Sequence, residues 1–210
     1  MTYRAPVRDL AFTLKAVAGV DRVAATGAFP DFDDDVMGAV LEAAGQLSEN
    51  VLAPLNRSGD QAGAVYANGA VTAAPGFADA YAEFAQGGWT GLAAPVHAGG
   101  QGLPKALELA AFETVHAANM AFGLCPMLSL AAIEALDAHG TEHQKTHYLP
   151  RLVSGEWTGA MCLTEPQAGS DLGALTSTAT PNGAFICPAP DPSDLKLLTK
   201  VPSGLNTCTR

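Results

Sequence analysis

Charged residues are scarce in this sequence, and basic residues are the scarcest. Only 15% of the 210 residues are charged, and 21 acidic against 11 basic residues leave a formal net charge of −10. This surplus argues against nucleic acid and anionic membrane surfaces as partners, because both are themselves negatively charged. Hydrophobic residues make up 48% of the chain, which indicates a packed globular protein and not a disordered one.

Cysteine and histidine patterns typical of metal sites are also missing. The sequence has four cysteines: Cys125, Cys162, Cys187 and Cys208. No two of them have C-x-x-C spacing, and the pair His143 and His147 lacks the rest of an H-E-x-x-H pattern, so we predict no metal site. The opening residues, MTYRAPVRDL, contain no signal-peptide pattern, and we therefore expect a cytoplasmic protein with reduced thiols.

No clean apolar run of membrane-spanning length is present. The most apolar window, residues 120–136, is interrupted by Gly123, Pro126 and Glu134. We predict a buried core helix there and no membrane span.

Helical periodicity is what the sequence does contain. From Val36 to Leu55 apolar residues recur at steps of three and four, after Asp33 to Asp35, whose carboxylates suit the first turn of a helix. The run NRSGDQAG is expected to end this helix. Further helices are predicted within residues 6–21 and over 75–86, 105–118, 120–138 and 141–153. Thr141 and Gln144 have the spacing of a capping box.

Glycine and proline mark the connections between these helices. Asn68-Gly69, between two short β-prone runs, predicts a small hairpin. The stretch GWTGLAAPVHAGGQGLP is expected to be a loop whose glycines have a conformational role. Pro75 suits a first helical turn, and Pro150 predicts a kink or an early end of its helix.

The period changes after Gly155. Residues 156–165, EWTGAMCLTE, alternate loosely and are rich in β-forming types, so we predict a strand. The residues CLTEPQAGSD end it. Pro, Gly, Ser and Asp are typical of a surface turn, but a Gly and short side chains also leave backbone N–H groups free to face an anion. After Gly183 the sequence becomes Pro-rich and aperiodic.

Two stretches resemble the acyl-CoA dehydrogenase family. The run HGTEHQKTHYLPRLVSGEWTGAMCLTEPQAGSDLGAL is similar to the family segment that joins the N-terminal helical domain to the middle β-domain. The earlier GGWTGLAAPVHAGGQGLP resembles a family loop, and the likeness covers about residues 31–180. The start, YRAPVRDLAFTL, is similar to the subfamily that includes 3-(methylthio)propanoyl-CoA dehydrogenase.

The resemblance implies a mainly α fold in three parts. It implies an N-terminal helical domain at residues 1–155 and the truncated start of the middle β-domain, with the FAD-binding motif, at 156–183. A divergent, irregular tail is expected at 184–210.

The resemblance also implies that Met161 to Ser170 hold FAD. Thr164 would meet the pyrimidine edge of the flavin through its hydroxyl and amide, and Leu163 and Cys162 would contribute backbone contacts. Gly169 and Ser170 would lie near the pyrophosphate, and Ser170 would also bind the acyl-CoA substrate.

The reaction implied is removal of an α-proton by a carboxylate, with transfer of the β-hydrogen as hydride to the flavin. The family's base is a Glu in or beside the C-terminal helical bundle, so we expect no catalytic residue in this sequence. Glu165, beside Pro166 in the turn, is not expected to be that base, and Asp171 is read as a turn or cap residue. The electron-transfer flavoprotein is the expected acceptor, and a homo-oligomer the expected full-length assembly.

The sequence departs from the family after Gly183. The strand pattern G-x-K-x-x-I-T/S expected next is not supplied by AFICPAPDPSDLKLLTK, which suggests a reading-frame change or a fragmentary product. We therefore expect a truncated chain that is inactive alone. A non-enzymatic helical interaction module and a fragment of an acyl-CoA oxidase remain alternatives.

Overall fold

The computed structural model describes residues 3–176, 179–182, 185–188 and 196–197. Its helical elements are, in chain order, α1 (Val7–Phe12), η1 (Thr13–Val17), α2 (Val20–Ala24), α3 (Asp34–Leu47), η2 (Ser48–Leu52), α4 (Ala53–Ala62), α5 (Phe77–Gln86), η3 (Trp89–Gly91), η4 (Val96–Ala98), α6 (Lys105–Ala118), α7 (Met120–His139), α8 (Glu142–Val153) and η5 (Leu172–Ala174). Its strands are β1 (Val65–Ala67), β2 (Ala70–Thr72), β3 (Met161–Cys162), β4 (Ala179–Asn182), β5 (Phe185–Pro188) and β6 (Lys196–Leu197). The predicted mainly α fold is confirmed.

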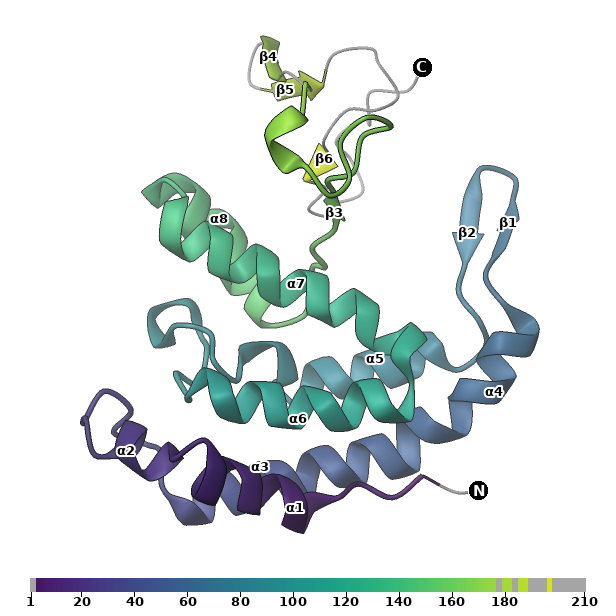
Figure 1. Cartoon of the computed structure of the whole chain (residues 1–210). Coiled ribbons are helices and arrows are strands. Elements are labelled where there is room, and N and C mark those ends of the chain that lie inside the picture. The colour runs from purple at the N-terminus through teal and green to yellow at the C-terminus, as the bar shows by residue number, and fades with distance from the viewer. Residues whose placement is uncertain (1–2, 177–178, 183–184, 189–195, 198–210) are drawn as a thin grey trace.

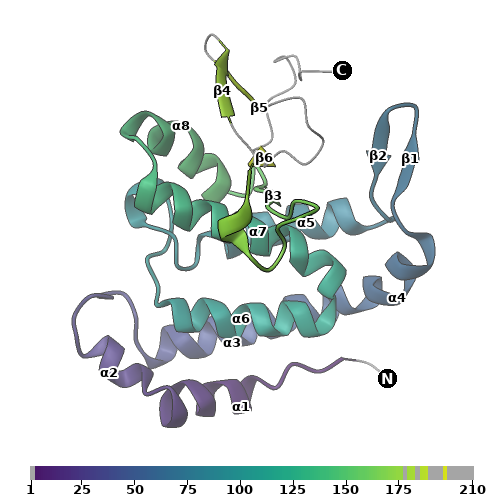
Figure 2. The same ribbon diagram turned by 45° about the horizontal axis from the view of Figure 1, so that its top comes forward.

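The long helices form a stack in which each packs on the next. Helix α3 contacts α6, α6 contacts α7, and α7 contacts α8 (Figure 1). The β1–β2 hairpin and the segment that begins with β3 both rise from the same side of this stack, the hairpin at one end beyond α4 and the β3 segment over α7 (Figure 2). The helices therefore form a platform, and the candidate site stands on it.

The helix predicted after Asp31 is one continuous rod, α3–η2–α4. Asp33 caps it, because its carboxylate accepts a hydrogen bond from the Val36 amide at 2.8 Å. The middle section, η2, is a wider π-helical turn. It ends two residues before Pro54, which has no N–H to donate to a regular helix. The rod ends at Gly63, the last residue of the predicted terminator run.

Aromatic side chains fill the centre of the stack. Phe84 is fully buried, and its ring makes edge-to-face contacts with Phe112 and Phe122, with centroids 5.9 and 5.6 Å apart. Such pairs add roughly 0.5–1.5 kcal/mol each beyond the burial of their area. They join α5 to α6 and α7, so three elements distant in sequence share one core.

A second apolar cluster joins α8 to the chain that follows it. Trp157 is 4% exposed, and the guanidinium of Arg151 lies 4.5 Å from its ring centroid. The Trp157 amide donates to the Arg151 carbonyl at 3.0 Å, and the Gly159 amide donates to the Ser129 hydroxyl at 3.0 Å. Because these amides bond to helices, the strand predicted over 156–165 is reduced to Met161–Cys162.

Proline affects the helices less than predicted. Pro150 lies inside α8, which continues to Val153, so the helix does not end early at this proline. The lost N–H falls in the last turn and costs only one helical bond there. Pro75 precedes α5, which begins at Phe77 after a left-handed Gly76. The predicted capping box of Thr141 and Gln144 is confirmed.

The predicted hairpin is also present. Strands β1 and β2 pair antiparallel, and Asn68 and Gly69 take positive φ values of 52° and 78° at the turn. In the region expected to be an irregular tail, β5 pairs with β4 and β6 pairs with β3, both antiparallel. The rest of that tail lies outside the described residues, and the proposed domain boundaries stay predictions.

Helix α7 is long and apolar enough to cross a membrane by length and composition, with a mean hydropathy of 1.5 in its most apolar window. A third of that window is buried, and the buried residues include Phe122, Ser129 and Ile133. The helix packs on α6 and α8, so the predicted helix is present, but it is only partly buried.

Candidate functional site

The segment after β3 folds back on itself in a tight turn. The Glu165 amide donates to the Ala168 carbonyl at 3.1 Å, and the Ala168 amide donates to the Glu165 carbonyl at 3.0 Å. Pro166 and Gln167 occupy the tip, and Ala168 is fully buried. The structure therefore contains a turn in the segment CLTEPQAGSD, where the sequence suggested one.

The Glu165 side chain closes the base of this loop. It is 2% exposed, and its Oε2 atom accepts hydrogen bonds from the Thr176 amide and the Thr176 hydroxyl, both at 3.0 Å. The side-chain amide of Gln167 donates to the same oxygen. The carboxylate is therefore used to close the loop. Its loop-closing role was missed from the sequence.

Asp171 is a cap residue, as predicted. Its carboxylate accepts a hydrogen bond from the Gly173 amide at 3.1 Å and so opens the short helix η5. This bond uses the acidic group locally, within the turn.

The residues predicted to hold FAD follow one another from β3 into the loop, and most of them are exposed. Thr164, Gly169 and Ser170 are exposed, Met161 is 44% exposed, and Leu163 is half-buried. The structure describes the backbone of Cys162 but not its side chain. Among the described residues, the amides of Gly169 and Ser170 and the hydroxyl of Thr164 make no hydrogen bond. These groups are free to bind a ligand that carries acceptors, such as a flavin or a diphosphate.

Gly169 is not required by the fold of the described chain. Its φ is not in the left-handed region, and a Cβ atom added there would meet only the Thr164 methyl group, at an ordinary 3.5 Å. A side chain at this position would instead extend from the exposed face of the loop. A glycine is useful there when another molecule must come close to the backbone.

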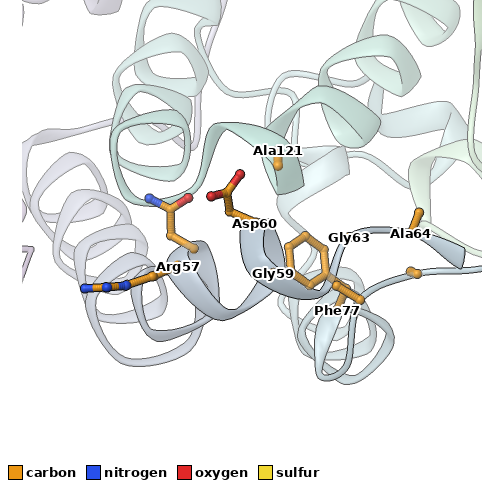
Figure 3. A pocket seen from close by; sticks show the side chains of 10 residues that line it. Arg57, Gly59, Asp60, Gly63, Ala64, Phe77 and Ala121 are labelled. Atoms are coloured by element: carbon orange, nitrogen blue, oxygen red, sulfur yellow. The ribbon is translucent and has the colours of Figure 1, made fainter.

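A separate hollow of about 580 Å³ lies at the base of the β1–β2 hairpin (Figure 3). The ring of Phe77 and the side chain of Asp60 face it, and most of its other lining residues are Gly or Ala. No residue of the 161–176 loop lines it. We therefore place the candidate site on the loop, because the loop offers hydrogen-bond donors, and not in the hollow at the hairpin.

The glycine-rich loop before α6 has the conformational role that was predicted. A Cβ atom at Gly100 would lie 2.1 Å from the Ala94 carbonyl oxygen, so only glycine fits. Glu108, 2% exposed, accepts a hydrogen bond from the Ala93 amide at 3.3 Å and pairs with Lys105. Lys105 also pairs with Glu134 of α7, so one lysine joins this loop and two helices. This buried network was missed from the sequence.

The paired histidines of α8 lie near Trp157. The rings of His143 and His147 stack with centroids 6.2 Å apart, and His147 also meets the Trp157 ring edge-on at 5.7 Å. Within the described residues, no group of three or more His, Cys, Asp or Glu side chains could hold a metal ion.

Known proteins share this helical platform. The profile of the acyl-CoA dehydrogenase N-terminal domain matches residues 38–156, more than half of the chain. The 3-methylmercaptopropionyl-CoA dehydrogenase of Ruegeria pomeroyi is 44% identical over 181 residues, which cover 86% of this chain and 31% of that protein.

Solved structures agree in fold. Butyryl-CoA dehydrogenase of Megasphaera elsdenii superposes with a TM-score of 0.59 at 25% identity, over 73% of this chain and 38% of that one. An acyl-CoA dehydrogenase of Bacillus anthracis, complexed with FAD, gives a TM-score of 0.59 at 24% identity, over 74% of this chain and 25% of that one.

The chain spans about a third of the length of the curated relatives that it matches. The match in sequence and the shared helical fold place it in a family without reference to any ligand. This chain belongs to the acyl-CoA dehydrogenase family.

Proposed function

We propose that this chain supplies the helical domain and one wall of the flavin site of an FAD-dependent acyl-CoA dehydrogenase. Such an enzyme converts an acyl-CoA thioester to a trans-2-enoyl-CoA. The observation that carries the proposal is the loop after β3, where Thr164, Gly169 and Ser170 are exposed. The Thr164 hydroxyl and the amides of Gly169 and Ser170 have no hydrogen-bond partner among the described residues. The Ruegeria relative is named as a dehydrogenase of this class, and the Bacillus structure is complexed with FAD.

The residues have distinct roles in this proposal. Thr164 binds the pyrimidine edge of the flavin ring through its hydroxyl and amide. Leu163 and Cys162 contribute backbone contacts, and Met161 belongs to the same cofactor-binding segment. Gly169 and Ser170 offer amides to the diphosphate, since neighbouring backbone N–H groups favour an anion. Ser170 also binds the acyl-CoA. FAD, when bound, supplies the acceptor for the hydride that leaves the substrate.

The catalytic base is not among the residues described. Glu165 is the acidic group nearest in sequence to Thr164, and its carboxylate is already hydrogen-bonded inside the loop. We propose that the base comes from the C-terminal helical bundle of the family and that these 210 residues are inactive alone. We further propose a cytoplasmic homo-oligomer that passes electrons to an electron-transfer flavoprotein.

An equilibrium titration of the purified chain with added FAD tests the cofactor role. We expect weak, saturable quenching of flavin fluorescence. Thr164→Val should raise the dissociation constant about 2- to 10-fold, because one net hydrogen bond is worth roughly 0.5–1.5 kcal/mol. Thr72→Val, an exposed threonine on the distant hairpin, is the matched control and should change nothing.

Two results would contradict the cofactor role. One is the absence of any saturable FAD signal, and the other is equal binding by wild type and Thr164→Val. Either would favour the alternative of a helical interaction module.

A further inference from the structure

We propose that Glu165 is the positioning residue of the cofactor loop. Its buried carboxylate holds the loop in the binding conformation before any ligand arrives. The role assigned to the loop rests on the proposed function, but the arrangement of the loop does not. Several hydrogen bonds converge on one oxygen atom of this buried carboxylate.

Three donors meet at the Oε2 atom of Glu165. Two belong to Thr176, its amide and its hydroxyl, each at 3.0 Å, and the third is the side-chain amide of Gln167. The same Gln167 amide also donates to the Thr176 hydroxyl at 3.0 Å. Thr176 is 11 residues away from Glu165 in sequence, so this contact closes the whole loop.

The anchored residues are direct neighbours of the residues predicted to bind FAD. Thr164 precedes Glu165, and Gly169 follows Ala168, the buried partner of Glu165 in the backbone turn. Fixing Glu165 and Ala168 inward therefore turns Thr164 and Gly169 toward the outer face. A loop that is ordered in advance binds with a smaller loss of entropy.

The inward direction of the carboxylate also matters for charge. An outward carboxylate beside Gly169 and Ser170 would repel a diphosphate. Buried and hydrogen-bonded, the same group orders the loop and keeps its charge away from the donor face. The family loop can thus contain an acidic residue and still offer its amides to an anion.

Amide hydrogen exchange on the flavin-free chain tests the proposal directly. In Glu165→Leu the Thr176 amide loses its acceptor, and we expect its exchange to become at least about 10-fold faster. Glu165→Gln keeps one side-chain oxygen and should restore most of the protection. Glu156→Leu removes an exposed glutamate outside the loop, and it should leave the exchange unchanged.

The melting temperature of the helical stack separates positioning from general stability. We expect it to change little in Glu165→Leu, because the hydrogen bonds described for the Glu165 side chain join it to residues 167 and 176 and not to the helices. If Glu165→Leu unfolds the stack, Thr176→Val provides a milder test, since it removes one of the three donors. Its amide should then exchange several-fold faster. Unchanged exchange at Thr176 in the folded variants, or no recovery in Glu165→Gln, would overturn the proposal.

The flavin titration separates this proposal from the cofactor role. Glu165→Leu should weaken FAD binding at least as much as Thr164→Val, whereas Thr164→Val should leave the exchange of the flavin-free loop unchanged. If the wild-type chain binds no FAD, the cofactor role fails. The exchange data then still decide whether Glu165 orders the loop.

Discussion

Asn119 occupies the corner between α6 and α7 and is 1% exposed. Its side-chain oxygen accepts a hydrogen bond from the Phe122 amide at 3.1 Å, which caps α7, and its Nδ2 atom donates to the Leu52 carbonyl at 3.2 Å. One amide therefore joins three elements. The sequence shows an Asn before a helix, but the second bond reaches 67 residues back along the chain and is visible only in the fold.

Replacing Asn119 should be costly for that reason. Asn119→Ala removes a cap and leaves the buried Leu52 carbonyl without its donor, so we expect a loss of about 2–3 kcal/mol in the free energy of unfolding. Urea denaturation followed by circular dichroism measures it. Asn56→Ala, an exposed helical asparagine, should stay within about 0.5 kcal/mol of wild type. Equal losses in both variants would show that Asn119 has no special role.

Tyr81 makes the stack sensitive to alkaline pH. Burial, and to a lesser degree the nearby Cys125 thiol, raise the pKa of Tyr81 to about 12 from its ordinary value of 10.0. Because the pKa is raised in the folded state, protonated Tyr81 contributes to the free energy of unfolding. This contribution is fully present below about pH 10 and is lost as the pH rises toward about 12.

Denaturation at a series of pH values across this range should therefore show that the free energy of unfolding falls more steeply with pH for wild type than for Tyr81→Phe. The exposed Tyr66 provides the control variant Tyr66→Phe, which should follow the wild-type curve. Parallel curves for wild type and Tyr81→Phe would mean that Tyr81 ionises equally in both states.

At the scale of elements, some glycines are required by the packing around them, and others could be replaced. Gly100 lies against the Ala94 carbonyl in the loop before α6, whereas a Cβ atom at Gly38 in α3 would have nothing within 4 Å. The sequence places Gly38 in a helix and Gly100 in a glycine-rich loop, but only the packing shows how closely the Ala94 carbonyl approaches Gly100. Gly100→Ala and Gly38→Ala should therefore have opposite effects.

We expect Gly100→Ala to lower the free energy of unfolding by about 3 kcal/mol or more, since backbone would have to move. Gly38→Ala should raise it by about 0.5–1 kcal/mol, because alanine favours a helix interior. Thermal denaturation of the two variants beside wild type measures both effects. A destabilising Gly38→Ala would show a neighbour that covers this face of α3.

At the scale of the whole molecule, the residues of the proposed cofactor site lie on an open face of the described part. The donor groups of the loop are exposed, and α7 keeps Met120, Leu124 and Met127 at least 40% exposed on the supporting platform. A flavin bound to an open face keeps much of its contact with water. It therefore gains less than it would in an enclosed pocket.

The purified 210-residue chain should accordingly be colourless. We expect no flavin absorbance band after gel filtration, because binding to one open wall is too weak to survive dilution. An absorbance spectrum of the eluted protein is the measurement, with added free FAD run alone as the control. A yellow protein peak would show that these residues enclose the cofactor by themselves.

Local rules determined much of this protein from its sequence. The apolar period of α3, the Asp33 cap, the Thr141 capping box and the Asn68-Gly69 turn each depend on residues close together along the chain. For such features the residue types alone set the backbone preference. The likeness of the CLTEPQAGSD segment to the family likewise depends only on consecutive residues.

Long-range packing decided the remainder. Trp157 has strand propensity, but its amide bonds to α8, and the predicted strand is cut short. Glu165 reads as an acidic residue in a turn, yet the distant Thr176 holds it inside the loop. Glu108 reads as part of a helix surface, and the fold buries it against Ala93 and Lys105. A buried polar group must find its partners, and which residues those are depends on contacts that only the tertiary structure creates.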